Sequence, residues 1–176
     1  MKTLKISLLL LLTLSVFTAC LNGKAKLQNS IQEKESRLSQ PGLPDTTTIS
    51  KLIVDYEQFA KKYPDDTLSP EYLYRAASWA NSINKAHKSI EIYNKILADY
   101  SDWEKIPETV FTLGFTYDNY LDDYVSANKM YNLFLSKYPD HELAKDVEGL
   151  LYYLGKSPEE MILDFERKNQ EAIENE

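Results

Sequence analysis

One short phrase occurs three times in this chain, and that repetition constrains the fold more than any other feature. Residues 59–64 read FAKKYP, residues 134–139 read FLSKYP, and residues 96–101, midway between them, read ILADYS. The copies lie about 37 residues apart, a length that accommodates two amphipathic helices. Because one helix pair cannot bury its apolar face alone, successive pairs must stack. The sequence therefore predicts an all-α superhelix of stacked antiparallel helix pairs, whose concave face is free to bind another molecule.

The first twenty residues have the pattern of an export signal. Lys2 and Lys5 precede an apolar run over residues 6–16, which is too short to cross a bilayer as a helix. Cys20, the single cysteine, follows Ala19 in a context that resembles the lipobox of bacterial lipoproteins, although Phe17 stands where that motif prefers leucine. The alternatives are an ordinary secreted protein and a buried free thiol.

The lipobox resemblance implies that residues 1–19 are a signal peptide and that Cys20 carries lipid. Membrane anchoring through that lipid would place the protein in the bacterial cell envelope, at the outer membrane and facing the periplasm. Loss of Lys2 and Lys5 would change the formal net charge from −7 to −9. Such an acidic chain, without a basic stripe, is a poor partner for nucleic acid.

Residues 20–48 contain few apolar side chains and include the breaker-rich segment SQPGLP at residues 39–44. We expect a lipidated cysteine and a flexible tether here. The spacing of Leu27, Ile31 and Leu38 also allows a short helix, so the sequence leaves that alternative open.

From residue 49 onward the apolar residues have helical spacing. We expect Pro64 to end a first helix, Pro70 to open the next at its first position after Ser69 as N-cap, and Gly155 to cap another helix in a left-handed conformation. Further helices are expected over residues 106–120, 124–138 and 142–154. The segment SPEE at residues 157–160 predicts a capping box that opens a last helix through Phe165, followed by an acidic tail.

Small and aromatic residues alternate through these segments in a specific order. Gly114, Tyr117, Ala127, Tyr131 and Pro139 closely resemble the signature of the tetratricopeptide repeat. The resemblance covers residues 49–155 and implies a right-handed superhelix of about three repeats, with residues 156–176 as a C-terminal helix and acidic tail. The phrases ending in Tyr-Pro also resemble repeat lipoproteins of bacterial envelopes that serve outer-membrane assembly or the Tol-Pal system.

The sequence offers little to a catalytic or metal-binding mechanism. His87 and His141 are far apart and lack the spacing of a zinc site, so surface histidines are the simpler interpretation. The acidic pairs at residues 65–66, 122–123 and 159–160 fit helix starts, where carboxylates are favourable. No phosphate-binding loop or nucleophile motif is present. We therefore expect no enzyme activity, no metal and no cofactor.

Binding is better supported than chemistry, because the repeat resemblance implies that the first helix of each pair lines the inner groove. Matching Ala77 and Gly114 to the small position of the repeat gives a mixed aromatic and acidic set of groove residues. These are Glu71, Tyr74, Ser78, Asn81, Glu108, Phe111, Phe115 and Asp118. The rings would anchor a peptide or helix, the acids would favour basic side chains, and Asn81 would offer its amide. Alternatively, some of these rings simply pack between neighbouring repeats.

Two functions from different classes follow from these observations. The first is a lipid-anchored scaffold that binds a protein or peptide partner in the cell envelope, in outer-membrane assembly or maintenance. The second is a solute-recognition lipoprotein that assists uptake of a glycan or peptide across the outer membrane, since aromatic rings also suit sugars. A groove built from so few repeats is poorly shaped to enclose a small molecule, which favours the scaffold.

Overall fold

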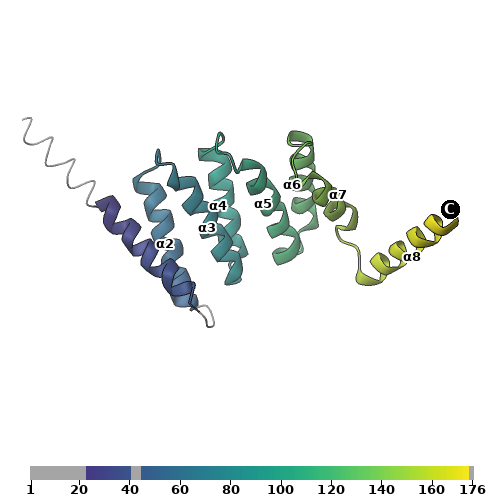
Figure 1. Cartoon of the computed structure of the whole chain (residues 1–176), viewed down its shortest axis with the longest axis horizontal. Helices are drawn as coiled ribbons and strands as arrows, with labels where there is room; N and C mark the ends of the chain where they lie inside the picture. Colours follow the sequence, from purple (N-terminus) through teal and green to yellow (C-terminus); the bar gives the residue numbers. More distant parts are fainter. Residues whose placement is uncertain (1–22, 41–44, 175–176) are drawn as a thin grey trace, which may run out of the picture. The chain divides into compact units, whose positions relative to one another are not determined.

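The computed structural model describes residues 23–40 and 45–174, and within them every regular element is a helix (Figure 1). The first helix spans residues 23–38. The others are α2 (Thr46–Lys62), α3 (Leu68–Ser82), α4 (Ala86–Asp99), α5 (Ile106–Leu121), α6 (Tyr124–Lys137), α7 (Ala144–Tyr153) and α8 (Pro158–Glu174). The chain divides into two compact units, one ending at Ile83 and the other beginning at Asn84.

The three copies of the repeated phrase end their helices in the same way. Tyr63, Tyr100 and Tyr138 are the C-cap residues of α2, α4 and α6, with φ angles of −131°, −133° and −133°. Each tyrosine N–H donates to the carbonyl of the residue four positions earlier. This conformation lies outside the α region, as expected for a residue before proline, and Tyr100 adopts it although a serine follows. The predicted ends of α2 and α6 are confirmed, and α4 ends in the same way.

The buried residues repeat together with the phrase. Tyr56, Tyr93 and Tyr131 are fully buried in α2, α4 and α6. Each precedes by three positions another fully buried residue, namely Phe59, Ile96 and Phe134. The three helices therefore present the same apolar face at the same point, and the predicted all-α repeat of helices is confirmed. The right-handed superhelix remains a prediction.

In the first unit, α2 packs against α3, and most of the residues of α3 that are buried are small. Ala76, Ala77 and Ala80 are fully buried. Tyr72 of α3 lies against two rings of α2, with its centroid 5.1 Å from that of Tyr56 and 4.8 Å from that of Phe59. Small side chains on one helix let the other approach closely, as the sequence predicted for Ala77.

Residues 23–38 form a helix, so the prediction of a flexible tether over residues 20–48 is wrong for this segment. Ile31 is buried, with 1% of its surface exposed. Polar contacts also fix the helix to α2, because Ser30 Oγ and Lys34 Nζ both lie 2.8 Å from Asp55 Oδ2. The helix is held by one buried apolar residue and by polar contacts to another helix, so the hydrophobic periodicity of its sequence is weak. This explains why the sequence allowed both a helix and a tether.

The start of α3 also differs from the prediction. The helix begins at Leu68, so Pro70 is its third residue, and Ser69 is not the N-cap. Ser69 is instead buried, and its hydroxyl donates to the Tyr63 carbonyl at 2.6 Å. Proline is still tolerated there, because the N–H groups of the first turn have no partner within the helix.

The second unit stacks α4 on α5, α5 on α6 and α6 on α7. Its core contains Val110, Ala127, Tyr131, Phe134, Ala144 and Val147. Gly114 of α5 lies directly against Tyr131 of α6: a Cβ atom at this position would be 2.9 Å from two ring carbons. Only glycine allows this approach without displacing a fully buried ring, which gives the physical reason for the predicted small residue.

The C-terminal segment begins as predicted but is helical for longer. Gly155 has φ of +73°, as expected for a left-handed cap after α7. The Ser157 N–H donates to Glu160 Oε2 at 2.7 Å and the Glu160 N–H donates to Ser157 Oγ at 3.2 Å, which confirms the capping box. Helix α8 then continues to Glu174, beyond the predicted end at Phe165, with Arg167 bonded to both Asp164 and Glu171.

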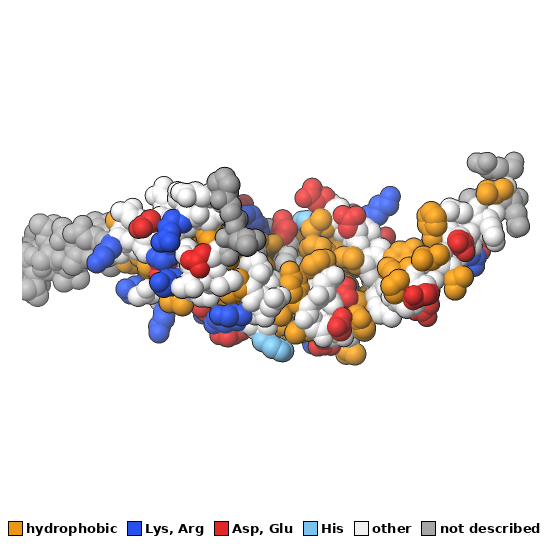
Figure 2. All heavy atoms as spheres, turned by 90° about the horizontal axis from the view of Figure 1, so that it is seen from below, with side chains coloured by type: hydrophobic (Ala, Val, Ile, Leu, Met, Phe, Trp, Pro, Cys, Tyr) orange, Lys and Arg blue, Asp and Glu red, His pale blue; other side chains and the backbone are white. Residues whose placement is uncertain are grey.

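Helix α8 exposes several large apolar side chains, which Figure 2 shows beside the grey C-terminal residues. They include Ile162, Leu163, Phe165 and Ile173. None of the helices in the described part of the chain has the length and apolar character needed to cross a bilayer. Cys20 and the predicted signal peptide lie outside the described residues.

Candidate functional site

The predicted groove residues of the second unit share one face of α5. Glu108, Phe111, Phe115 and Asp118 follow one another at steps of three, four and three residues, and all four are half-buried. This spacing keeps them in one row along the helix. The row is partly accessible, with two aromatic rings between two carboxylates.

The two rings in this row have different environments. Phe111 lies at the edge of the core, with its centroid 6.3 Å from that of buried Phe134. Phe115 contacts Phe111, with 6.2 Å between the centroids, and does not belong to the core cluster. The alternative that some rings pack into the repeat therefore holds for Phe111, whereas Phe115 is the better placed to contact a partner.

The carboxylates at the two ends of the row lie close to α6 and to the turn that follows it. Tyr131 Oη of α6 donates to Asp118 Oδ2 at 3.2 Å. Burial raises the pKa of Asp118, although the hydrogen bond from Tyr131 acts in the opposite direction. Glu108 Oε1 is 3.8 Å from Nε2 of His141, and Glu108 Oε2 is buried with no hydrogen-bond partner among the described residues.

His141 has a structural environment rather than that of a free surface residue. Its Nδ1 accepts the Leu143 N–H at 3.2 Å, and its ring lies edge-on to Phe134 with 5.4 Å between the centroids. His87 is exposed, as the sequence predicted. Among the described residues, no three His, Cys, Asp or Glu side chains are placed to hold a metal ion.

The predicted groove residues of the first unit lie on α3, in a row spaced like that on α5. Glu71 Oε1 accepts from Arg75 Nε at 2.8 Å, and Ser78 Oγ donates to the Tyr74 carbonyl at 3.1 Å. Asn81 is only 6% exposed, so the expectation that it offers its amide at the surface is wrong. It lies in the last turn of α3, where burial depends on tertiary packing rather than on helical spacing.

A buried tyrosine bonded to a carboxylate of the preceding helix occurs in both units. In the second unit Tyr131 donates to Asp118 of α5, and in the first unit Tyr56 Oη donates to Glu35 Oε1 at 2.5 Å. Glu35 belongs to the helix over residues 23–38. In this contact the helix has the same relation to α2 as α5 has to α6. Burial, together with the Glu35 carboxylate, raises the pKa of Tyr56, so the phenol stays neutral as a donor.

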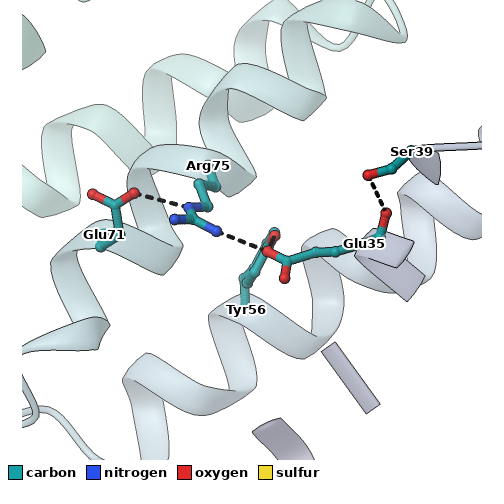
Figure 3. Close-up of polar contacts among 5 residues, drawn as sticks. All are labelled: Glu35, Ser39, Tyr56, Glu71 and Arg75. Carbon is teal, nitrogen blue, oxygen red and sulfur yellow. Dashed lines mark hydrogen bonds and ion pairs between the residues drawn. The ribbon is translucent and has the colours of Figure 1, made fainter. Parts of the chain in front are cut away.

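Glu35 also reaches the third helix of its unit. Arg75 Nη1 lies 2.9 Å from Glu35 Oε1, so the guanidinium bridges Glu35 and Glu71 (Figure 3). Neither Glu35 nor Arg75 was among the residues predicted from the sequence. The available signal was the spacing of Leu27, Ile31 and Leu38, which places Glu35 on the apolar side of the short helix that this spacing allows.

Comparison with known families identifies part of the second unit. Residues 108–141 match the model of the tetratricopeptide repeat. The match begins with Glu108 of α5, includes all of α6 and ends at His141, so it contains both helices of one pair and the closing Tyr138 turn. No curated protein matches the chain. The matched segment supports the repeat type that the sequence resembles, and repeats of this type generally bind protein partners.

Proposed function

We propose that this protein is a lipid-anchored scaffold of the bacterial cell envelope. It binds a protein or peptide partner along the groove-lining face of the first helix of each pair, on α3 and α5. The observation that carries the proposal is the tetratricopeptide repeat at residues 108–141, with Phe115 half-exposed between acidic residues on the face of α5. The proposal includes no catalytic step. In its most specific form, the proposal gives this scaffold a role in outer-membrane assembly or maintenance.

The chemistry of the α5 face suggests how a partner would bind. A flat aromatic ring contributes contact area at low conformational cost, and such rings are frequent binding hot spots. Glu108 and Asp118, one at each end of the row, favour basic side chains on the partner. Because neither carboxylate is fully buried, electrostatic attraction would mainly guide association and orientation.

Replacing Phe115 by alanine should reduce partner binding strongly, because it removes the aromatic anchor of this row. We expect at least about a tenfold loss of partner recovered by affinity purification from detergent-solubilised envelopes, measured by quantitative mass spectrometry. The matched control is Tyr120→Ala, which removes an exposed ring from another face of the same helix. Equal recovery by both variants, with circular dichroism showing intact helices, would contradict a partner site on this face.

The lipid anchor is tested separately through Cys20. Cells that express the native chain should incorporate labelled palmitate into it, and Cys20→Ala should abolish the label because the thiol is the acceptor. The same variant should move from the membrane fraction to the soluble fraction after cell fractionation. Persistent labelling of the alanine variant would show that the lipid, if any, is attached elsewhere.

A further inference from the structure

The first unit contains a pocket formed by residues from three helices and the end of the first of them. It has a volume of about 390 Å³ and lies between the helix over residues 23–38, α2 and α3. Its walls are formed by Glu35, Leu38, Ser39, Tyr56, Arg75 and Trp79. This volume is within the range of sites that take a small ligand or a single side chain.

The polar groups in this pocket are only partly used within the protein. Glu35 Oε1 takes both contacts, from Tyr56 Oη at 2.5 Å and from Arg75 Nη1 at 2.9 Å (Figure 3). Both of these contacts, from α2 and from α3, use the same oxygen, which leaves Glu35 Oε2 as the oxygen that a donor of the ligand would contact. The Glu35 side chain is 30% exposed, so the side chain that carries this carboxylate is partly accessible from outside.

The charge around the pocket favours a cation. Glu35 and Arg75, the charged residues of the lining, offset each other. Glu71 does not line the pocket but is paired with Arg75, so the three-residue cluster keeps one negative charge. The whole chain is also acidic, with a formal net charge of −7. An anionic group that approached Arg75 would meet both carboxylates, whereas a cation at Glu35 Oε2 would compensate the excess charge.

The apolar walls of the pocket suit the rest of a long basic side chain. Leu38 and Trp79 are both half-buried, so each offers a partly accessible apolar surface. A lysine or arginine side chain carries an alkyl stem that packs on such surfaces while its charged group remains at the opening. Tryptophan is also the aromatic residue with the strongest attraction for a cation over its face.

We propose that this pocket binds the side chain of a lysine or arginine in an extended peptide segment of the partner. The inference rests on the proposed function, since it assumes that the partner is a protein or peptide. It adds a basic residue to the expected recognition motif and gives the N-terminal helix a role in binding, because Glu35 supplies the acceptor.

The test uses blocked five-residue peptides of glycine with lysine, arginine, norleucine or glutamate at the centre. Binding is followed by the fluorescence of Trp79 in a full-length Trp103→Phe chain, which retains a single tryptophan. We expect saturable changes with the lysine or arginine peptide that weaken as salt rises, and at least about fivefold weaker binding of norleucine and glutamate peptides. Equal binding of norleucine, tighter binding of glutamate, or no saturable change with any peptide would overturn the proposal.

Two substitutions in the N-terminal helix connect this binding to Glu35. Glu35→Gln keeps the shape and removes the charge, and should weaken binding of the basic peptide at least about fivefold. Glu33→Gln removes the same charge from an exposed position of the same helix and should leave binding unchanged. If Glu35→Gln lowers helix content, Trp79→Phe provides a second variant, with binding followed by NMR of the peptide. Equal effects of the Glu33 and Glu35 variants would overturn the assignment.

The Phe115→Ala chain separates this inference from the proposed function. Its peptide binding should equal that of the native chain, because Phe115 belongs to the other unit. Partner recovery unaffected by Phe115→Ala, with intact peptide binding, would reject the α5 face and retain the pocket. Loss of partner recovery with Phe115→Ala, but no binding of any peptide, would reject the pocket and retain the α5 face.

Discussion

Replacing Phe134 by alanine should destabilise the second unit by about 3–5 kcal/mol, the range measured for deletion of buried aromatic side chains. Phe134 is fully buried and contacts the rings of Phe111, Tyr138 and His141, at centroid distances of 6.3, 5.6 and 5.4 Å. These neighbours come from α5 and from the turn after α6, so they cannot close the resulting cavity without moving the helices.

Phe165 provides the matched control, because it is the same residue type in a helix of the same unit but is 63% exposed. Phe165→Ala should change the stability by less than about 0.5 kcal/mol. Urea denaturation followed by Trp103 fluorescence in a Trp79→Phe background reports on the second unit, since Trp103 is then its single tryptophan. Similar losses for the two variants would mean that the phrase FLSKYP does not form the core described above.

The helices were predictable wherever the repeated phrase controls both packing and termination. Tyr131 and Phe134 share a buried face because they are three residues apart, and the Tyr-Pro sequence that follows ends the helix locally. Both effects depend on neighbours in the sequence, so periodicity and backbone chemistry suffice to predict them. The same reasoning placed Phe115 on the face of α5, although its role in binding remains a prediction.

Contacts between distant segments were not predictable in this way. The bond from Tyr56 to Glu35 spans 21 positions, whereas the equivalent bond from Tyr131 to Asp118 spans 13. Because the connection before α2 is longer, the two carboxylates do not align when the repeats are compared by spacing alone. Burial of Asn81 has a similar origin, since it depends on which element covers the end of α3 rather than on the order of residues within it.

The docking of the N-terminal helix leads to the second large effect that we expect. Ile31→Ala should destabilise the first unit by about 2–5 kcal/mol, and Ile31→Val by about 0.5–1.5 kcal/mol, because Ile31 is 1% exposed and its lost methyl groups leave a cavity. Gln32→Ala, at the next and exposed position of the same helix, should change the stability by less than about 0.5 kcal/mol.

Urea denaturation followed by Trp79 fluorescence in the Trp103→Phe background measures this effect in the first unit. A flexible tether and a docked helix give opposite expectations here, because a tether would tolerate all three substitutions equally. A graded loss from valine to alanine at position 31 would show that the helix is part of the folded unit. Docking of this helix is also what places Glu35 beside Tyr56 and Arg75, and the pocket between these helices requires it. If Ile31→Ala leaves the stability of the first unit unchanged, residues 23–38 act as a tether and not as a docked helix.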